Sequence, residues 1–195
     1  MTRSSWRGIR ACAGLALFVV AGAPMAMAQG KTEVYNATAA MKTAGGASVS
    51  APVVVSITRW TTDAERDKAV AALKSGGTTA VQKQLAAATD VGTLQVGQVK
   101  TPIRFARALP VEGGKVVTLV TSQPVFYVGA GLPESKPTDK AGYDVAVVIF
   151  QVDAAGKGDV GDFAPAAKVK LDERGAFVVE DYAAEAVRLT GIARK

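Results

Sequence analysis

The side chains best suited to bind a ligand are Arg59, Trp60, Arg104 and Arg107. A guanidinium binds carboxylate or phosphate through two parallel hydrogen bonds, and an indole ring offers a flat apolar surface. These four residues form our candidate binding site, and the chemistry they indicate is anion recognition. Each also has a structural explanation, because an arginine on an apolar strand face can pair with a carboxylate, and Trp60 can pack on the core.

The two later arginines lie in a predicted strand from Pro102 to Leu109. Arg104 and Arg107 are an odd number of residues apart, so a regular strand places them on opposite faces. They share one patch only if a β-bulge intervenes. Arg107 shares its predicted face with Ile103 and Phe105, which favours a structural ion pair over a free anion site.

Most side-chain catalysis is excluded by composition. Histidine is absent, and the single cysteine, Cys12, precedes a predicted cleavage site, so we expect no catalytic triad, no His/Cys metal site and no cofactor. Carboxylate acid–base chemistry, a Ser-Lys pair or an all-oxygen metal site remain. Glu180 and Asp181 diverge on a strand, and Asp144 and Asp153 bracket another strand, so neither makes a convincing catalytic pair. We predict no metal site and favour a protein without enzymatic activity.

Residues 1–28 have the pattern of a secretory signal peptide. Three arginines precede an apolar run at residues 11–23, and Ala26-Met27-Ala28 fits a cleavage site. The run is short for a membrane span, so we expect a periplasmic or secreted protein with no stable membrane insertion after cleavage; the alternative is an uncleaved anchor. Cleavage removes three of the 23 basic residues and none of the 17 acidic ones, so the net charge falls from +6 to +3. We therefore predict no nucleic-acid partner.

The rest of the chain predicts a flexible segment at residues 29–50 and one domain at residues 51–195. The only clearly helical stretch follows Trp60. Thr62 with Glu65 makes one capping box, and Thr79 with Gln82 makes a second. Because two glycines separate the boxes, we expect a two-helix hairpin inserted after the first strand.

The remaining segments alternate as strands do. Val53, Val55 and Ile57 predict one core-facing row, and Val111-Glu112-Gly113-Gly114 predicts a hairpin turn. Residues 143–152 are apolar on both faces, which indicates a central strand that the helical stretch covers on its second face. The predicted fold class is α+β: a mainly antiparallel sheet, curled or folded into a sandwich, with the two-helix hairpin packed on it.

Three segments carry a family resemblance. Residues 57–66, the run Ile103-Arg104-Phe105-Ala106-Arg107 and the ending Val187-Arg188-Leu189-Thr190 resemble a family of small secreted bacterial proteins of the acidobacterial type, which has no assigned activity. The resemblance implies secretion and a single domain, and it implies no catalytic or binding residues. We predict a non-catalytic protein that binds a small ligand or an envelope protein; the alternative is a carboxylate-dependent hydrolase of the cell envelope.

Overall fold

The computed structural model describes residues 32–42, 48–125, 141–183 and 187–195 of the 195-residue chain. These residues form nine strands and one helix. In chain order they are β1 (Glu33–Lys42), β2 (Ser48–Ile57), α1 (Asp63–Ala86), β3 (Gly92–Val96), β4 (Val99–Val111), β5 (Gly114–Thr121), β6 (Val145–Asp153), β7 (Lys157–Leu171), β8 (Phe177–Tyr182) and β9 (Val187–Arg194).

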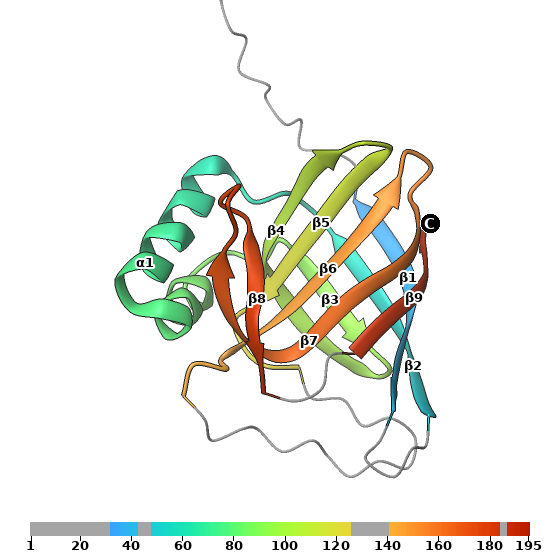
Figure 1. Cartoon of the computed structure of the whole chain (residues 1–195), viewed down its shortest axis with the longest axis horizontal. Coiled ribbons are helices and arrows are strands. Elements are labelled where there is room, and N and C mark those ends of the chain that lie inside the picture. Colours follow the sequence, from blue (N-terminus) through green and yellow to red (C-terminus); the bar gives the residue numbers. More distant parts are fainter. Residues whose placement is uncertain (1–31, 43–47, 126–140, 184–186) are drawn as a thin grey trace, which may run out of the picture.

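Eight of the strands form a closed antiparallel barrel (Figure 1). Their order is β6-β5-β4-β3-β2-β1-β9-β7, and the pairing of β7 with β6 closes the ring. The predicted α+β curled sheet or sandwich is therefore wrong. Alternation along the sequence identifies strands, but it does not show the long-range pairings, such as those of β1 with β9 and of β6 with β7, that a closed barrel needs.

β1 lies in the segment at residues 29–50 that the sequence predicted to be flexible. It pairs along its whole length with β2 and also with β9, so it completes the barrel wall. Tyr35 and Ala39 are its most deeply buried residues. The small residues between them hide the strand pattern, which explains the error. The predicted leader and most of the predicted loop at residues 129–142 lie outside the described residues.

β7 is long enough to pair with three strands. Ala167 pairs with Val145 of β6 on one side and with Tyr182 of β8 on the other. Phe163 pairs with Val187 of β9, on the same edge of β7 where β8 pairs further along the strand. β8 and β9 therefore follow one another beside β7, and the β7–β8 hairpin extends beyond the barrel.

Apolar side chains fill the barrel interior. Val53, Val55 and Ile57 are 1–2% exposed, which confirms the core-facing row predicted for this strand. Tyr35 of β1 and Phe150 of β6 meet edge to face across the interior, with ring centroids 5.1 Å apart. Each fully buried side chain of this size contributes roughly 1.5–3 kcal/mol to folding, so the packed interior is the main source of stability.

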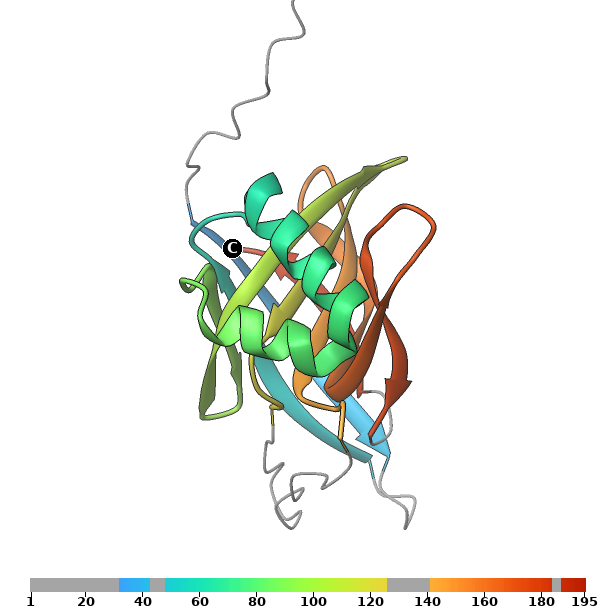
Figure 2. The same ribbon diagram turned by 90° about the vertical axis from the view of Figure 1, so that its left-hand side faces the viewer.

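A second apolar cluster lies outside the barrel, beneath α1 and the β7–β8 hairpin (Figure 2). Val81 and Leu85 of α1 pack there with Val145 and Val147 of β6. The other face of β6 belongs to the interior cluster. The prediction that the helical stretch covers the second face of the strand at residues 143–152 is therefore confirmed.

α1 is a single kinked helix, so the predicted two-helix hairpin is wrong. Gly76 (φ −155°, ψ 20°) and Gly77 (φ 66°, ψ −159°) leave the helical conformation, but the helix resumes at once in a new direction (Figure 2). The first capping box is confirmed. The Thr62 hydroxyl accepts a hydrogen bond from the Glu65 amide, and the Glu65 carboxylate accepts one from the Thr62 amide at 2.8 Å.

The second predicted capping box does not form. The Thr79 hydroxyl instead donates to the Asp144 carboxylate at 2.8 Å, next to the start of β6. The Gln82 amide donates to the Ser122 carbonyl at 3.0 Å, just after β5. Both side chains therefore tie the second half of α1 to the barrel and do not cap a new helix.

Candidate functional site

Arg59 follows β2 and holds the start of α1 in place. Its guanidinium donates two hydrogen bonds to Glu65, at 3.0 and 2.9 Å, and a longer one of 3.4 Å to the Thr89 carbonyl. The hydrogen bonds from Arg59 lower the pKa of the Glu65 carboxyl to about 2. The carboxylate is ionised and already paired, so Arg59 acts here as a structural residue.

A β-bulge in β4 decides which way its side chains point. The register with β5 shifts between Ile103 and Phe105, so Ile103 lies in the interior cluster and Phe105 lies in the outer one. The predicted shared face of Ile103 and Arg107 is therefore wrong. Arg107 Nη1 donates to the Asp63 carboxylate at 2.9 Å and to the Thr61 carbonyl at 3.1 Å. Its predicted pairing with a carboxylate is confirmed.

Arg104 lies within the bulge and contacts the residues that follow α1. Its Nη1 is 2.9 Å from the Asp90 carboxylate and also donates to the Ala88 carbonyl. Its Nε is buried and has no acceptor among the described residues. Arg104 is thus held by residues that follow α1 and Arg107 by residues at its start, and the two line different cavities.

Trp60 packs against the interior cluster at one end of the barrel, which confirms the core-packing interpretation. Lys115 Nζ lies 5.1 Å from the centroid of its ring and 2.8 Å from the Glu33 carboxylate. Burial opposes the ionisation of Glu33, but hydrogen bonds from Lys115 and Tyr35 outweigh it and lower the Glu33 pKa. Trp60 therefore packs on the core beside the Lys115–Glu33 ion pair.

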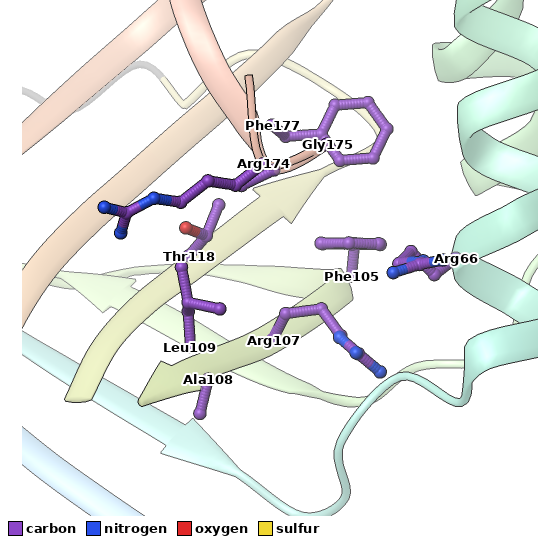
Figure 3. A pocket seen from close by; sticks show the side chains of 10 residues that line it. Arg66, Phe105, Arg107, Ala108, Leu109, Thr118, Arg174, Gly175 and Phe177 are labelled. Carbon is purple, nitrogen blue, oxygen red and sulfur yellow. The ribbon is translucent and has the colours of Figure 1, made fainter. Parts of the chain in front are cut away.

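Arg107 also lines a groove on the outer face of the barrel, which we call the arginine groove (Figure 3). It lies between the first half of α1, strands β4 and β5, and the turn before β8, and its volume is about 70 Å³. Its lining residues are Arg66, Phe105, Arg107, Ala108, Leu109, Thr118, Arg174, Gly175, Ala176 and Phe177.

Two polar side chains of the arginine groove have no partner among the described residues. Thr118 is only 7% exposed, yet its hydroxyl forms no hydrogen bond with any of them. Arg174 is exposed, and its guanidinium forms no ion pair within the same part of the chain. Figure 3 shows both groups directed to one side of the groove, while Arg66 and Arg107 reach toward the other. The Thr118 hydroxyl is itself accessible to solvent, because Arg104 Nε is the only buried side-chain polar atom without a partner in the described part of the chain.

Thr118 and Arg174 were not among the residues predicted from the sequence. A signal for Thr118 was present, because the predicted hairpin turn at residues 111–114 fixes a register that places Thr118 directly opposite Arg107, as the structure shows. Arg174 carries no comparable signal, since it lies in a turn whose approach to β4 depends on the path of the β7–β8 hairpin.

A larger pocket of about 210 Å³ lies beside the end of α1. Its lining residues are Thr61, Glu65, Lys68, Gln84, Leu85, Ala87, Ala88, Thr89, Arg104 and Phe105. The charges that it partly buries, on Glu65 and Arg104, are already paired with Arg59 and Asp90. This pocket also contains the buried, unpartnered Arg104 Nε, but the arginine groove is the better candidate for an anion, because Arg174 there has no ion pair among the described residues.

The carboxylates that pair with the candidate arginines are poorly suited to catalysis. Asp63 and Glu65 are each paired with an arginine, and the low pKa of Glu65 makes it a poor general acid. No group of three or more His, Cys, Asp or Glu residues in the described part of the chain is arranged to hold a metal ion. Within the described ranges, no helix is long and apolar enough to cross a membrane.

The comparisons with known proteins leave the family open. The resemblance to secreted acidobacterial-type proteins stays a prediction. The chain matches no protein-family model, no curated protein and no solved structure.

Proposed function

We propose that this protein is a non-catalytic binding protein that holds a small anion in the arginine groove. The observation that carries the proposal is the exposed guanidinium of Arg174, which has no ion pair among the described residues, in a groove also lined by the unpartnered Thr118 hydroxyl and by Arg107. A hydroxyl donor and two guanidinium donors are the groups that bind a carboxylate or phosphate oxygen.

The guanidinium groups retain donors for such a ligand. Arg107 uses only Nη1 in its bonds to Asp63 and Thr61, which leaves its Nε and Nη2 donors for another acceptor. Arg174 has all five of its donors available within the described part of the chain. The ion pair of Arg107 with Asp63 fixes its position, so the groove is organised before a ligand arrives.

The cellular setting is part of the same proposal. The predicted leader supports a periplasmic or secreted protein, where a small ligand or an envelope protein carrying an anionic group would be the partner. Asp63 and Asp67 beside the groove are each paired with an arginine, which does not favour a carboxylate-dependent hydrolase there.

The test is a titration of the ¹⁵N-labelled protein with acetate and, separately, with inorganic phosphate, followed by two-dimensional NMR. We expect saturable shifts of the Thr118 and Gly175 amides with at least one anion, at millimolar concentrations. Thr118→Val and Arg174→Gln should each weaken binding at least fivefold. Thr93→Val in β3 and Arg188→Gln in β9 are matched controls outside the groove, and they should not alter it.

Two results would refute the proposal. One is the absence of saturable shifts with either anion in a folded protein. The other is binding that Thr118→Val and Arg174→Gln leave unchanged, since the anion would then sit elsewhere.

A further inference from the structure

We infer that the ligand of the arginine groove is a monoanionic carboxylate with a short apolar chain beside it. This inference rests on the proposed function and names the class of ligand. It follows from the order of side chains along the groove, from the size of the groove and from its charge.

Apolar and polar side chains alternate along the floor of the groove. Phe105, Arg107 and Leu109 lie on the outer face of β4, two residues apart. Phe105 is 3% exposed and is sealed by Phe177, whose ring centroid is 5.0 Å away. Leu109 is 38% exposed and leaves the other end open. The groove therefore has a closed apolar end, a polar centre at Arg107 and Thr118, and an open apolar end.

The volume of the groove limits what can enter its centre. About 70 Å³ corresponds to roughly two water molecules, which suits a carboxylate head and is far below the several hundred Å³ of a pocket for a whole organic ligand. The rest of the ligand must leave through the open end. There the ligand contacts Leu109 and also Val116, the cross-strand neighbour of Leu109 on β5. An exposed leucine beside an anion site gives an apolar chain a surface to cover.

The charge balance favours one negative charge over two. Three arginines line the groove, and two of them are paired with Asp63 and Asp67, so one positive charge is left over. The adjoining turn adds Asp172 and Glu173. Asp172 accepts hydrogen bonds from the backbone amides of Arg174 and Ala176, which holds its carboxylate in the turn. These two acids offset the surplus, so a phosphate dianion would meet more repulsion at the groove than a carboxylate monoanion.

The test compares acetate, butyrate, hexanoate and inorganic phosphate by the same NMR titration of the protein. We expect affinity to rise from acetate to butyrate by about two- to fourfold for each added methylene group, and phosphate to bind at least tenfold more weakly than butyrate. Leu109→Ala should remove most of the gain with chain length. Val160→Ala removes another exposed apolar side chain, on β7 outside the groove, and should have no effect.

The outcomes separate this inference from the proposed function. If acetate, hexanoate and phosphate bind equally well, or if Leu109→Ala does not affect the chain-length series, the carboxylate inference is wrong and the anion site stands. If none of the four anions produces saturable shifts, both are wrong. Butyrate and hexanoate binding that is lost in Thr118→Val and reduced in Leu109→Ala would support both.

Discussion

Replacing the two threonines that begin the predicted capping boxes tests whether α1 is one kinked helix or two. Thr62 and Thr79 are each followed three residues later by Glu or Gln, so the sequence assigns them the same role. In the structure only Thr62 caps a helix, whereas the Thr79 hydroxyl donates to Asp144 on the surface. Thr62→Ala and Thr79→Ala should therefore have different effects on the free energy of unfolding.

The structure sets the expected sizes of these effects. Thr62→Ala removes the hydroxyl that accepts from the Glu65 amide at 3.3 Å, and loss of such a cap costs about 1 kcal/mol. Glu65 stays in place through its two bonds to Arg59, so the loss does not spread. Thr79→Ala removes one hydrogen bond between exposed side chains and should cost less than about 0.5 kcal/mol.

Guanidinium chloride unfolding monitored by circular dichroism measures both variants. Thr62→Ala should lower the midpoint with an unchanged slope and reduce Tm by about 2–4 °C, the shift expected for 1 kcal/mol in a chain of this length. Equal losses for the two variants would mean that Thr79 caps a separate helix, and the single-helix description would be refuted. An unchanged midpoint for Thr62→Ala would refute the capping argument itself.

Two further predictions concern the stability of the fold in acid and the kink of α1 at Gly77. In the folded protein the pKa values of Glu33 and Glu65 lie below the ordinary 4.5, so in acid the unfolded chain binds more protons than the folded protein does. The stability that these carboxylates contribute above about pH 4.5 should therefore fall as the pH drops toward 2. Denaturant midpoints measured between pH 6 and pH 3 check this, and a Glu65→Gln variant with undiminished pH dependence would exclude Glu65 as a contributor. Gly77→Ala places a side chain at φ 66° and should lower the free energy of unfolding, measured by thermal unfolding, by about 1–3 kcal/mol. Lys74→Ala, on the exposed helix face, should change it by less than about 0.5 kcal/mol. Similar values for the two variants would show that the fold does not hold Gly77 in this left-handed conformation.

Local features of the fold were predictable because they depend on neighbouring residues. The Thr62 capping box, the inward row Val53, Val55 and Ile57, and the hairpin turn before Gly114 all follow from short-range geometry. Closure of the barrel was not predictable in this way. It depends on β1 pairing with β9, strands at opposite ends of the sequence, and the small residues of β1 give little alternation to reveal it.

The candidate site was likewise predictable in its local features and not in its long-range contacts. Arg107 was identified from its residue type and its place on an apolar strand, and its ion pair with a carboxylate was anticipated. The β4 bulge was raised only as a condition, because nothing in the residues from Pro102 to Leu109 requires one. Arg174 was missed because its position depends on the β7–β8 hairpin folding over the outer face of the barrel, a long-range contact that Phe105 and Phe177 seal.

The bulge and the filled interior together explain why the candidate site lies outside the barrel. Eight strands enclose little more than their own inward side chains, and here rings such as Tyr35 and Phe150 occupy that space. The register shift in β4 turns Phe105 outward while Ala106 stays inside, so Arg107 continues the outward row. The outer apolar cluster must then be shielded from water, and α1 and the β7–β8 hairpin, which come from different parts of the chain, shield it. The arginine groove lies where these covers meet, so an anion bound there would join them and raise Tm with the logarithm of its concentration once that concentration exceeds Kd.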